Sequence, residues 1–142
     1  MLFLSIAAVS AGTFEREAVK VDLTSQEFRS LAVSSNGKYL AAGDCEGNLH
    51  IYNLQTSEYT CLQGAHDAEI LTLSFTLSTQ DISGEIANNS YFLASGGRDC
   101  IIHLYDVERN FELIGSVDDH SAAVTSIKVS SNSCNILSCS AD

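Results

Sequence analysis

The feature that most constrains the fold of this chain is a pattern of apolar runs that recurs three times in register. In the central copy, over 66–106, a histidine precedes an alternating apolar run, a second run leads into a tight turn, and a third run follows. The histidine position is occupied by Thr24, His66 and His120, which gives spacings of 42 and 54 residues. A period of about 40–45 residues is typical of folds built from repeated units. The chain is therefore predicted to be a series of similar units.

The longer second spacing is explained by one insert. The step from the first apolar run to the second takes 12 positions over 28–40 and over 124–136, but 23 positions over 70–93. Eleven of the 12 additional residues therefore lie in a polar stretch at 76–91, and the register holds elsewhere. A polar loop of this length is either a surface decoration or a partner-docking loop, and both interpretations stay open.

The apolar runs are predicted to be β-strands, because apolar and polar residues alternate along them. Asn36-Gly37 lies between the first two runs, and Asn-Gly tolerates the positive φ of a tight hairpin turn. The chain has no proline, as expected where strands are paired on both sides. The predicted strands are 28–33, 39–43, 48–54 and 58–63 in the first unit, 70–75, 91–96, 101–107 and 111–117 in the second, and 123–129 and 135–140 in the third.

Composition narrows the class of partner. The formal net charge of −11 argues against nucleic acid, whose phosphates require clusters of Lys and Arg. No apolar run reaches the roughly 18 residues that would span a membrane. The five cysteines show no C-x-x-C spacing, which favours reduced thiols in an intracellular protein. We therefore expect protein partners, with no nucleic acid, membrane or small-molecule substrate, and a cytoplasmic location.

The third run of the first two units ends in Tyr52-Asn53 and Tyr105-Asp106, where WD-repeat β-propellers carry Trp-Asp. The chain is similar to these proteins, and the segments AHDAEIL and DDHSAAVT more specifically resemble the mitogen-activated protein kinase-binding protein 1 family. The resemblance implies an all-β fragment of about two and a half four-stranded antiparallel blades, from the start of a second propeller, whose ring is not closed. It also implies a non-enzymatic signalling scaffold, associated in animal relatives with stress kinases and with the cytoskeleton at spindle poles.

Four segments are expected on this basis. Residues 1–27 would be a strand of a preceding blade, or an interdomain strand, followed by a charged connector; a signal peptide at 1–12 is the alternative. The first blade would span 28–65, the second 66–119 and a truncated third 120–142. Because propellers close with typically four to eight blades, this chain alone is expected to be poorly stable and to self-associate through open strand edges.

The resemblance also implies a buried hydrogen-bond network in the blades. It would tie the loop before the first strand of a blade to the turn between its second and third strands. The network residues would be His66, Ser95, Asp99 and Tyr105 in the second blade, and His120, Ser138 and Asp142 in the third. The first blade departs from the pattern, with Thr24 and Glu46 at the histidine and aspartate positions. A structural role is favoured over a nucleophilic triad, so we expect no catalytic residue and no cofactor.

His50 and His103 occupy equivalent positions in the third strands of the first two blades. A metal site needs three or four convergent ligands, and one histidine in each blade does not supply them. The sequence therefore predicts two solvent-facing histidines and no metal site.

Acidic residues gather in the loops before each first strand and in the turns after each second strand. These segments share one rim in propellers of this family, and we name their acids the acidic rim. Its residues are Glu27, Asp44, Glu46, Asp67, Glu69, Asp118 and Asp119. A field of one sign attracts partners of the opposite sign, so this rim is a candidate binding surface for basic protein segments.

Three functions remain open from the sequence. The first is an interaction scaffold, favoured because no catalytic constellation is present. The second is a WD-repeat substrate receptor of a ubiquitin ligase, which would require adaptor-binding elements elsewhere. The third is a propeller-borne hydrolase that uses His66 and Asp99, which would require a cleft open to solvent.

Overall fold

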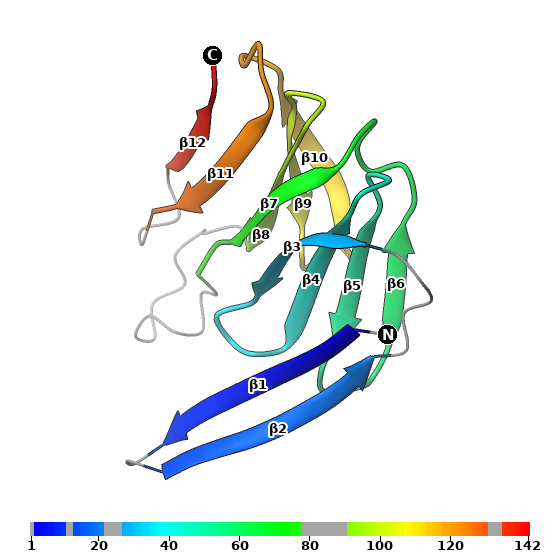
Figure 1. Cartoon of the computed structure of the whole chain (residues 1–142), viewed down its shortest axis with the longest axis vertical. Helices are drawn as coiled ribbons and strands as arrows, with labels where there is room; N and C mark the ends of the chain where they lie inside the picture. Colours follow the sequence, from blue (N-terminus) through cyan, green and yellow to red (C-terminus); the bar gives the residue numbers. More distant parts are fainter. Residues whose placement is uncertain (1, 11–12, 22–26, 78–90, 131–134) are drawn as a thin grey trace.

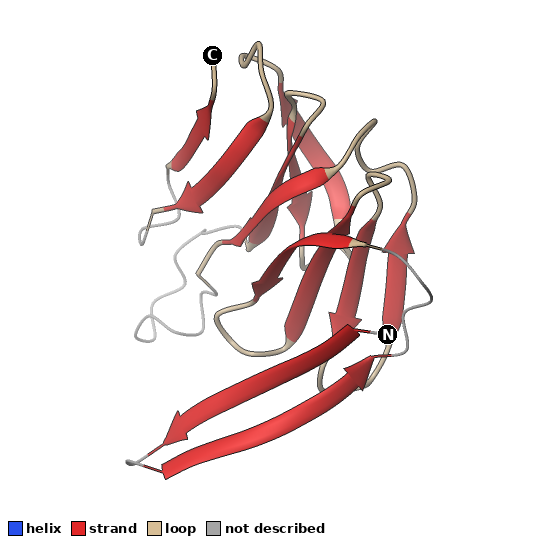
Figure 2. Ribbon diagram, viewed as in Figure 1, coloured by secondary structure: helices blue, strands red, loops and turns tan. Residues whose placement is uncertain are grey.

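The computed structural model describes residues 2–10, 13–21, 27–77, 91–130 and 135–142. Every regular element in this part is a β-strand (Figure 1, Figure 2). The strands are β1 (Leu2–Ser10), β2 (Thr13–Val21), β3 (Phe28–Val33), β4 (Tyr39–Asp44), β5 (Leu49–Asn53), β6 (Tyr59–Leu62), β7 (Ile70–Phe75), β8 (Phe92–Gly97), β9 (Ile102–Asp106), β10 (Glu112–Val117), β11 (Val124–Val129) and β12 (Ile136–Ser140).

The strands form antiparallel sheets in which neighbours along the chain are also neighbours in space. The orders are β3-β4-β5-β6, β7-β8-β9-β10 and β11-β12, with a separate β1-β2 hairpin. β3 lies beside β7, and β7 lies beside β11 (Figure 1). Successive sheets therefore pack against each other through their first strands, as the blades of a propeller do around its axis. The described sheets do not close a ring, which confirms the predicted all-β class and the open arrangement of blades.

The N-terminal region differs from the expectation of one strand and a connector. The charged stretch contains a second strand, β2, which pairs antiparallel with β1 from Leu2↔Val21 to Ser10↔Thr13. Pairing along nine positions satisfies backbone groups that a connector would leave to water. Figure 1 shows this hairpin beyond the lower ends of β4, β5 and β6.

Glycines in the second strands allow adjacent blades to approach closely. A Cβ added to Gly43 in β4 would lie 2.5 Å from Cβ of Ile70, and one added to Gly96 in β8 would lie 2.7 Å from Cγ1 of Val124. Ile70 and Val124 are fully buried first residues of β7 and β11. Because such contacts would be far inside van der Waals distance, only glycine permits this packing.

Two hydrogen bonds also cross between the blades. The Ser30 hydroxyl donates to the Ile70 carbonyl at 2.9 Å, and the Ile127 N–H donates to Thr72 Oγ1 at 2.9 Å. Ser30 and Thr72 are equivalent residues, each just after a register shift at the start of β3 or β7. Hydroxyl groups at equivalent positions therefore make polar contacts across both blade interfaces, in addition to the apolar packing.

The base of the polar insert at 76–91 is closed. The Thr76 N–H donates to the Phe92 carbonyl, and the Phe92 N–H donates to Thr76 Oγ1, both at 2.9 Å. Residues 78–90, on which the choice between decoration and docking loop rests, lie outside the described part of the chain.

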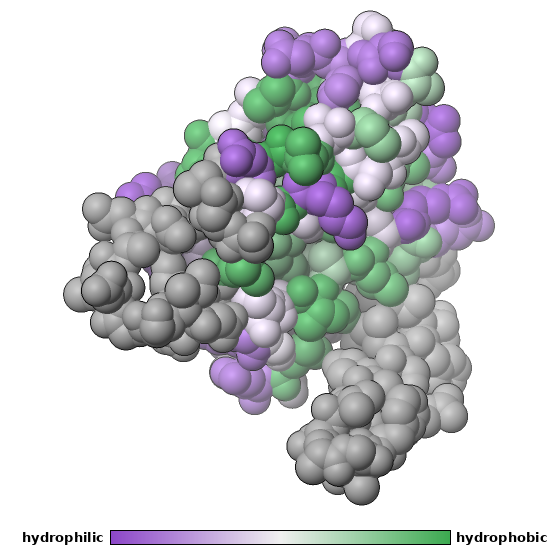
Figure 3. Space-filling view, turned by 90° about the vertical axis from the view of Figure 1, so that its left-hand side faces the viewer, coloured by the Kyte–Doolittle hydropathy of each residue, from purple (hydrophilic) through white to green (hydrophobic). Residues whose placement is uncertain are grey.

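The β11-β12 sheet has two described strands and exposes a large apolar residue. Leu137 in β12 is 68% exposed, and β12 pairs only with β11 among the described strands. Figure 3, which views the molecule from the left-hand side of Figure 1, shows apolar patches among the polar side chains of that face. An unpaired edge beside exposed apolar residues favours association with another strand.

Candidate functional site

In the second blade, His66 connects three segments of the chain. Its Nδ1 donates to the Asp99 carboxylate at 2.9 Å, and its Nε2 accepts from the Ser95 hydroxyl at 2.7 Å. Asp99 also accepts the N–H groups of Asp67 at 3.0 Å and Ile101 at 3.2 Å. The loop before β7 is thereby joined to β8 and to the turn that follows β8.

The charge state of Asp99 follows from these contacts. Burial acts to raise its pKa, but the hydrogen bond and charge of His66 and the two backbone N–H groups outweigh burial, so the pKa lies below the ordinary value. Tyr105 is also buried, and burial raises its pKa, while a hydrogen bond with Ser95 acts in the opposite direction. The four residues therefore form one chain of hydrogen bonds ending in an ionised carboxylate.

The third blade has the corresponding contacts. His120 Nδ1 donates to Asp142 at 3.2 Å, and His120 Nε2 accepts from Ser138 at 2.8 Å. The Ser121 N–H donates to Asp142 at 2.8 Å, and this bond is the main cause that lowers the Asp142 pKa to about 2. Unlike those of the second blade, the side chains of His120 and Asp142 are partly exposed.

The first blade contains a different buried pair, which sequence reasoning missed. His50 Nε2 donates to Asp44 at 2.9 Å, and His50 Nδ1 accepts from the Tyr59 hydroxyl at 2.8 Å. Asp44 also accepts the N–H and the side-chain amide of Asn48 and the N–H of Glu46. Burial acts to raise the Asp44 pKa, but these donors outweigh it and hold the pKa below its ordinary value. Burial raises the Tyr59 pKa, and contact with Cys61 adds to the rise.

Two sequence predictions are therefore wrong in the first blade. His50 is only 1% exposed rather than solvent-facing, because its ring packs edge-to-face on Phe28 and bonds to Asp44. Asp44 is 0% exposed, so it does not belong to an exposed acidic rim. The available signal was the pairing of Asp44 with a histidine six residues later at an inward strand position. The position of Thr24 lies outside the described residues.

His103 also differs from the prediction of a solvent-facing side chain. Its ring lies 4.5 Å from that of His66, and its Nδ1 is 2.7 Å from the Ser116 hydroxyl. Burial, followed by the nearby charge of His66, lowers the His103 pKa. The outward position in the strand is thus partly covered by the loop that carries His66.

His66, Asp99 and His103 form one group with metal-ligating atoms, which lie within 4.8 Å of one another. Both ring nitrogens of His66 and both carboxylate oxygens of Asp99 already make hydrogen bonds. Ligand atoms bound to zinc lie only about 2.0–2.2 Å from the ion, so a metal would break these bonds. The present geometry fits a hydrogen-bond cluster better than a metal centre.

The same geometry bears on nucleophilic chemistry. Ser95 Oγ and His66 Nε2 are placed as a nucleophile and a base would be. Ser95 is completely buried and His66 is 3% exposed. A substrate carbonyl could not approach Ser95 without opening the blade, so the arrangement lacks the open cleft that a hydrolase requires.

The remaining acidic-rim residues are distributed in two ways. Glu27 forms an ion pair with Arg29, and Glu69 contacts both Arg29 and Arg98. The other four are exposed, and no Lys or Arg forms an ion pair with them among the described residues. These four, which we name the open rim acids, are Glu46, Asp67, Asp118 and Asp119.

In the described part of the chain, no helix is long and apolar enough to cross a bilayer. The sequence matches the family described as WD domain, G-beta repeat over residues 21–53, 59–106 and 111–142. WD repeat-containing protein 62 of Sus scrofa is 36% identical over 115 residues, which cover 80% of this chain and 7% of that protein. Mitogen-activated protein kinase-binding protein 1 of Homo sapiens is 35% identical over 116 residues, again 80% of this chain and 7% of the relative.

Solved structures with the same fold are more distant in sequence. A chain in a crystal structure of a mitotic checkpoint complex has a TM-score of 0.71 at 23% identity, over 96% of this chain and 40% of that chain. The structure of U3-55K has a TM-score of 0.62 at 22% identity, over 87% of this chain and 36% of that chain. With the repeated blades and the matched segments, these similarities establish that the chain belongs to the WD domain, G-beta repeat family.

Proposed function

We propose that this chain forms part of a non-enzymatic interaction scaffold whose open rim acids bind basic segments of other proteins. The observation that carries the proposal is a division of polar groups. The histidine, serine and aspartate side chains that could take part in catalysis make internal hydrogen bonds. The open rim acids, by contrast, are exposed and form no ion pair with Lys or Arg in the described structure.

The open rim acids lie in loops on the same end of the blades. The turn after β4, the loop before β7 and the loop before β11 all lie at the upper end of Figure 1. The His66 N–H donates to the Gly47 carbonyl at 3.0 Å, so the first two of these segments are held together. Negative charges on connected loops add their electrostatic fields at the place where a cationic segment would bind.

The family supports a protein-binding role, because WD-repeat propellers are typically scaffolds without catalytic activity. One relative is named as a binding protein for a mitogen-activated protein kinase. We propose the same kind of signalling assembly for the protein that carries this chain. The chain covers only 7% of that relative, so the proposal concerns the contribution of this segment to the assembly.

The test is binding of a labelled peptide of alternating Arg and Gly, measured by fluorescence anisotropy. In the variant with Glu46→Gln, Asp118→Asn and Asp119→Asn, we expect at least a roughly threefold loss of affinity, because exposed charge pairs contribute about 0.2–1 kcal/mol each. Raising the salt to about 0.15 M should weaken binding to the unmodified chain more than to this variant.

The matched control is Glu108→Gln with Glu112→Gln, which removes exposed acids outside the rim. This control should bind the peptide nearly as well as the unmodified chain. Equal losses in the two variants would mean that net charge alone attracts the peptide, and the rim would then not be the binding surface.

A further inference from the structure

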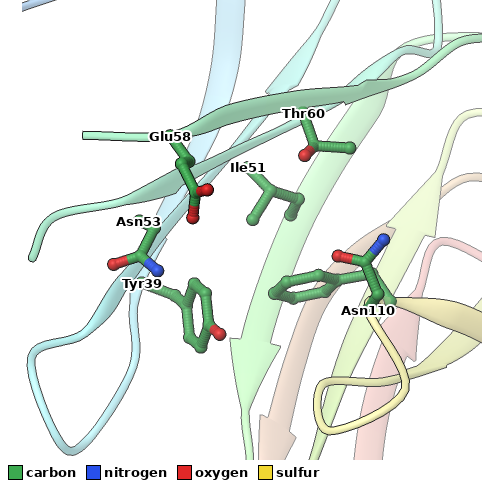
Figure 4. A pocket seen from close by; sticks show the side chains of 7 residues that line it. Tyr39, Ile51, Asn53, Glu58, Thr60 and Asn110 are labelled. Carbon is green, nitrogen blue, oxygen red and sulfur yellow. The ribbon is translucent and has the colours of Figure 1, made fainter. Parts of the chain in front are cut away.

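A small polar cavity lies at the end of the first two blades that is opposite the open rim acids, between the turn after β5 and the turn after β9 (Figure 4). Its volume is about 70 Å³. One water needs roughly 10–15 Å³, whereas pockets for drug-sized ligands measure roughly 300–1,000 Å³. The cavity therefore has room for the end of one side chain. It is lined by Tyr39, Ile51, Asn53, Glu58, Thr60, Asn110 and Phe111.

The walls of the cavity are fixed by the sequence of the two turns. Asn53 Oδ1 accepts the N–H groups of Gln55 at 3.0 Å and Thr56 at 3.2 Å. The side-chain amide nitrogen is left facing the cavity, as Figure 4 shows. On the opposite wall, Asn110 and Phe111 have φ angles of 54° and 60°. This left-handed conformation is costly for a phenylalanine and is retained where packing holds it.

Phe111 supplies that packing. It is 4% exposed, and its ring lies edge-to-face with Tyr39 at a centroid distance of 5.3 Å. The contact joins the second blade to the first and sets one aromatic wall of the cavity. It also fixes the neighbouring Asn110, whose side-chain oxygen points toward the space between the walls in Figure 4.

Apart from the Asn53 amide nitrogen, the polar groups that face the cavity can accept hydrogen bonds, which favours a cation with several N–H donors. The Glu58 carboxylate, the Asn110 carbonyl and the Thr60 hydroxyl all face the space in Figure 4. One Glu58 oxygen accepts the Thr56 hydroxyl at 2.7 Å, which orients the carboxylate. Among the described residues, no Lys or Arg forms an ion pair with Glu58. The negatively charged Glu58 carboxylate, near two aromatic rings, is thus left without a cationic partner in the described structure.

Nearby cations of the chain are engaged outside the cavity. Lys38 Nζ lies 5.0 Å from the centroid of the Tyr39 ring, so this ring already accepts a cation on its surface. Arg109 is paired with Asp106 at 3.5 Å. Neither residue lines the cavity.

We propose that this cavity is a subsite for an arginine side chain of a partner protein. The planar guanidinium carries five donors and packs against aromatic rings, which matches the Glu58, Asn110 and Thr60 acceptors beside Tyr39 and Phe111. Both walls belong to four-stranded sheets, so the subsite does not depend on the β11-β12 sheet. It is separate from the open rim acids, which lie at the other end of the blades.

The probe for this subsite is N-acetyl-Gly-Arg-Gly-amide, observed by saturation-transfer NMR with the full chain. Saturation should reach the arginine side-chain methylenes and should fall at least fivefold in Glu58→Gln, which keeps the hydrogen bond from Thr56 but removes the charge. Asn110→Gly should also weaken the signal, since glycine accepts the left-handed φ without strain but lacks the side-chain carbonyl that would accept a hydrogen bond. Glu112→Gln, at an exposed site outside the cavity, should leave the signal unchanged.

Two peptides of the same length define the ligand class. The citrulline peptide, which lacks the charge, and the lysine peptide, which lacks the planar fork, should both give at least threefold weaker signals. An unchanged signal in Glu58→Gln, or an equal signal from citrulline, would overturn the subsite. An equal signal from lysine would overturn the arginine assignment. The Glu46, Asp118 and Asp119 variant should retain the signal, so this inference and the rim proposal can fail separately.

Discussion

The first and second blades both bury a histidine–aspartate pair, but a different ring nitrogen of the histidine contacts the aspartate in each blade. In the first blade, Nε2 of His50 donates to Asp44 and Nδ1 accepts from a tyrosine hydroxyl. In the second blade, Nδ1 of His66 donates to Asp99 and Nε2 accepts from Ser95. In each pair, one ring nitrogen faces the carboxylate and the other faces a hydroxyl group.

The two pairs also connect different parts of the chain. Asp44 and His50 are six residues apart and join the turn after β4 to β5 of the same blade. His66 and Asp99 are 33 residues apart and hold the loop between two blades onto the second blade. The first pair thus stabilises a hairpin, whereas the second fixes the position of one blade relative to the next.

The difference follows from a few substitutions in the repeat. Ala42 stands where the second blade has Ser95, and Glu46 stands where it has Asp99. The first blade therefore lacks the hydroxyl and the short carboxylate that would receive a histidine from the preceding loop. Asp44 supplies a carboxylate inside the blade instead, and His50 reaches it from β5. One blade geometry accommodates both solutions because each satisfies its buried polar groups completely.

The largest expected effect is at Asp44. Asp44→Ala should lower the free energy of unfolding by about 3–5 kcal/mol, because it leaves the buried His50 and the partly buried Asn48 without their charged partner. Urea unfolding followed by circular dichroism measures the change. Glu46→Ala is the matched control, since this acid is exposed and should change stability by less than about 0.5 kcal/mol. Equal effects at the two positions would contradict the assignment of the buried network to Asp44.

A smaller effect is expected at His66. His66→Ala removes the donor to Asp99 and the acceptor for Ser95, and should cost about 1–3 kcal/mol. Because this pair fixes a loop, hydrogen exchange of the Asp67 and Ile101 amides should accelerate more than that of amides in β4. An unchanged unfolding midpoint together with unchanged exchange at these two amides would rule out a structural role for the network.

The smallest effect is a pH dependence. The pKa of Asp44 is held below the ordinary value of 3.8 in the folded protein. Its ionised form therefore contributes stability that is present above the unfolded pKa and is lost as the pH falls through the folded pKa. We expect Asp44→Asn to show a shallower loss of stability below about pH 3.8 than the unmodified chain. Parallel pH profiles in urea titrations would contradict this linkage.

Most of the fold was readable from the sequence because strands and turns leave local signals. The alternation along 70–75 and the turn at Asn36-Gly37 predicted elements that the structure confirms as β7 and as the turn between β3 and β4. The resemblance to WD-repeat blades implied the candidate network residues of the second blade, and the structure places polar atoms of His66, Ser95 and Asp99 within hydrogen-bond distance. Their contribution to stability stays a prediction.

By itself, the sequence determined the repeat, its register, the strands of each blade and the family. Only the tertiary structure showed that Asp44 and His50 are buried. Asp44 has the local context of an exposed turn acid, and it is buried because His50 and Asn48 fold onto it. The cavity between the turns at Asn53 and Asn110 likewise exists only when two blades are packed together. Sequence patterns indicate which face of a strand is apolar. The burial of a polar side chain and the shape of a cavity depend on the segments that pack against that strand.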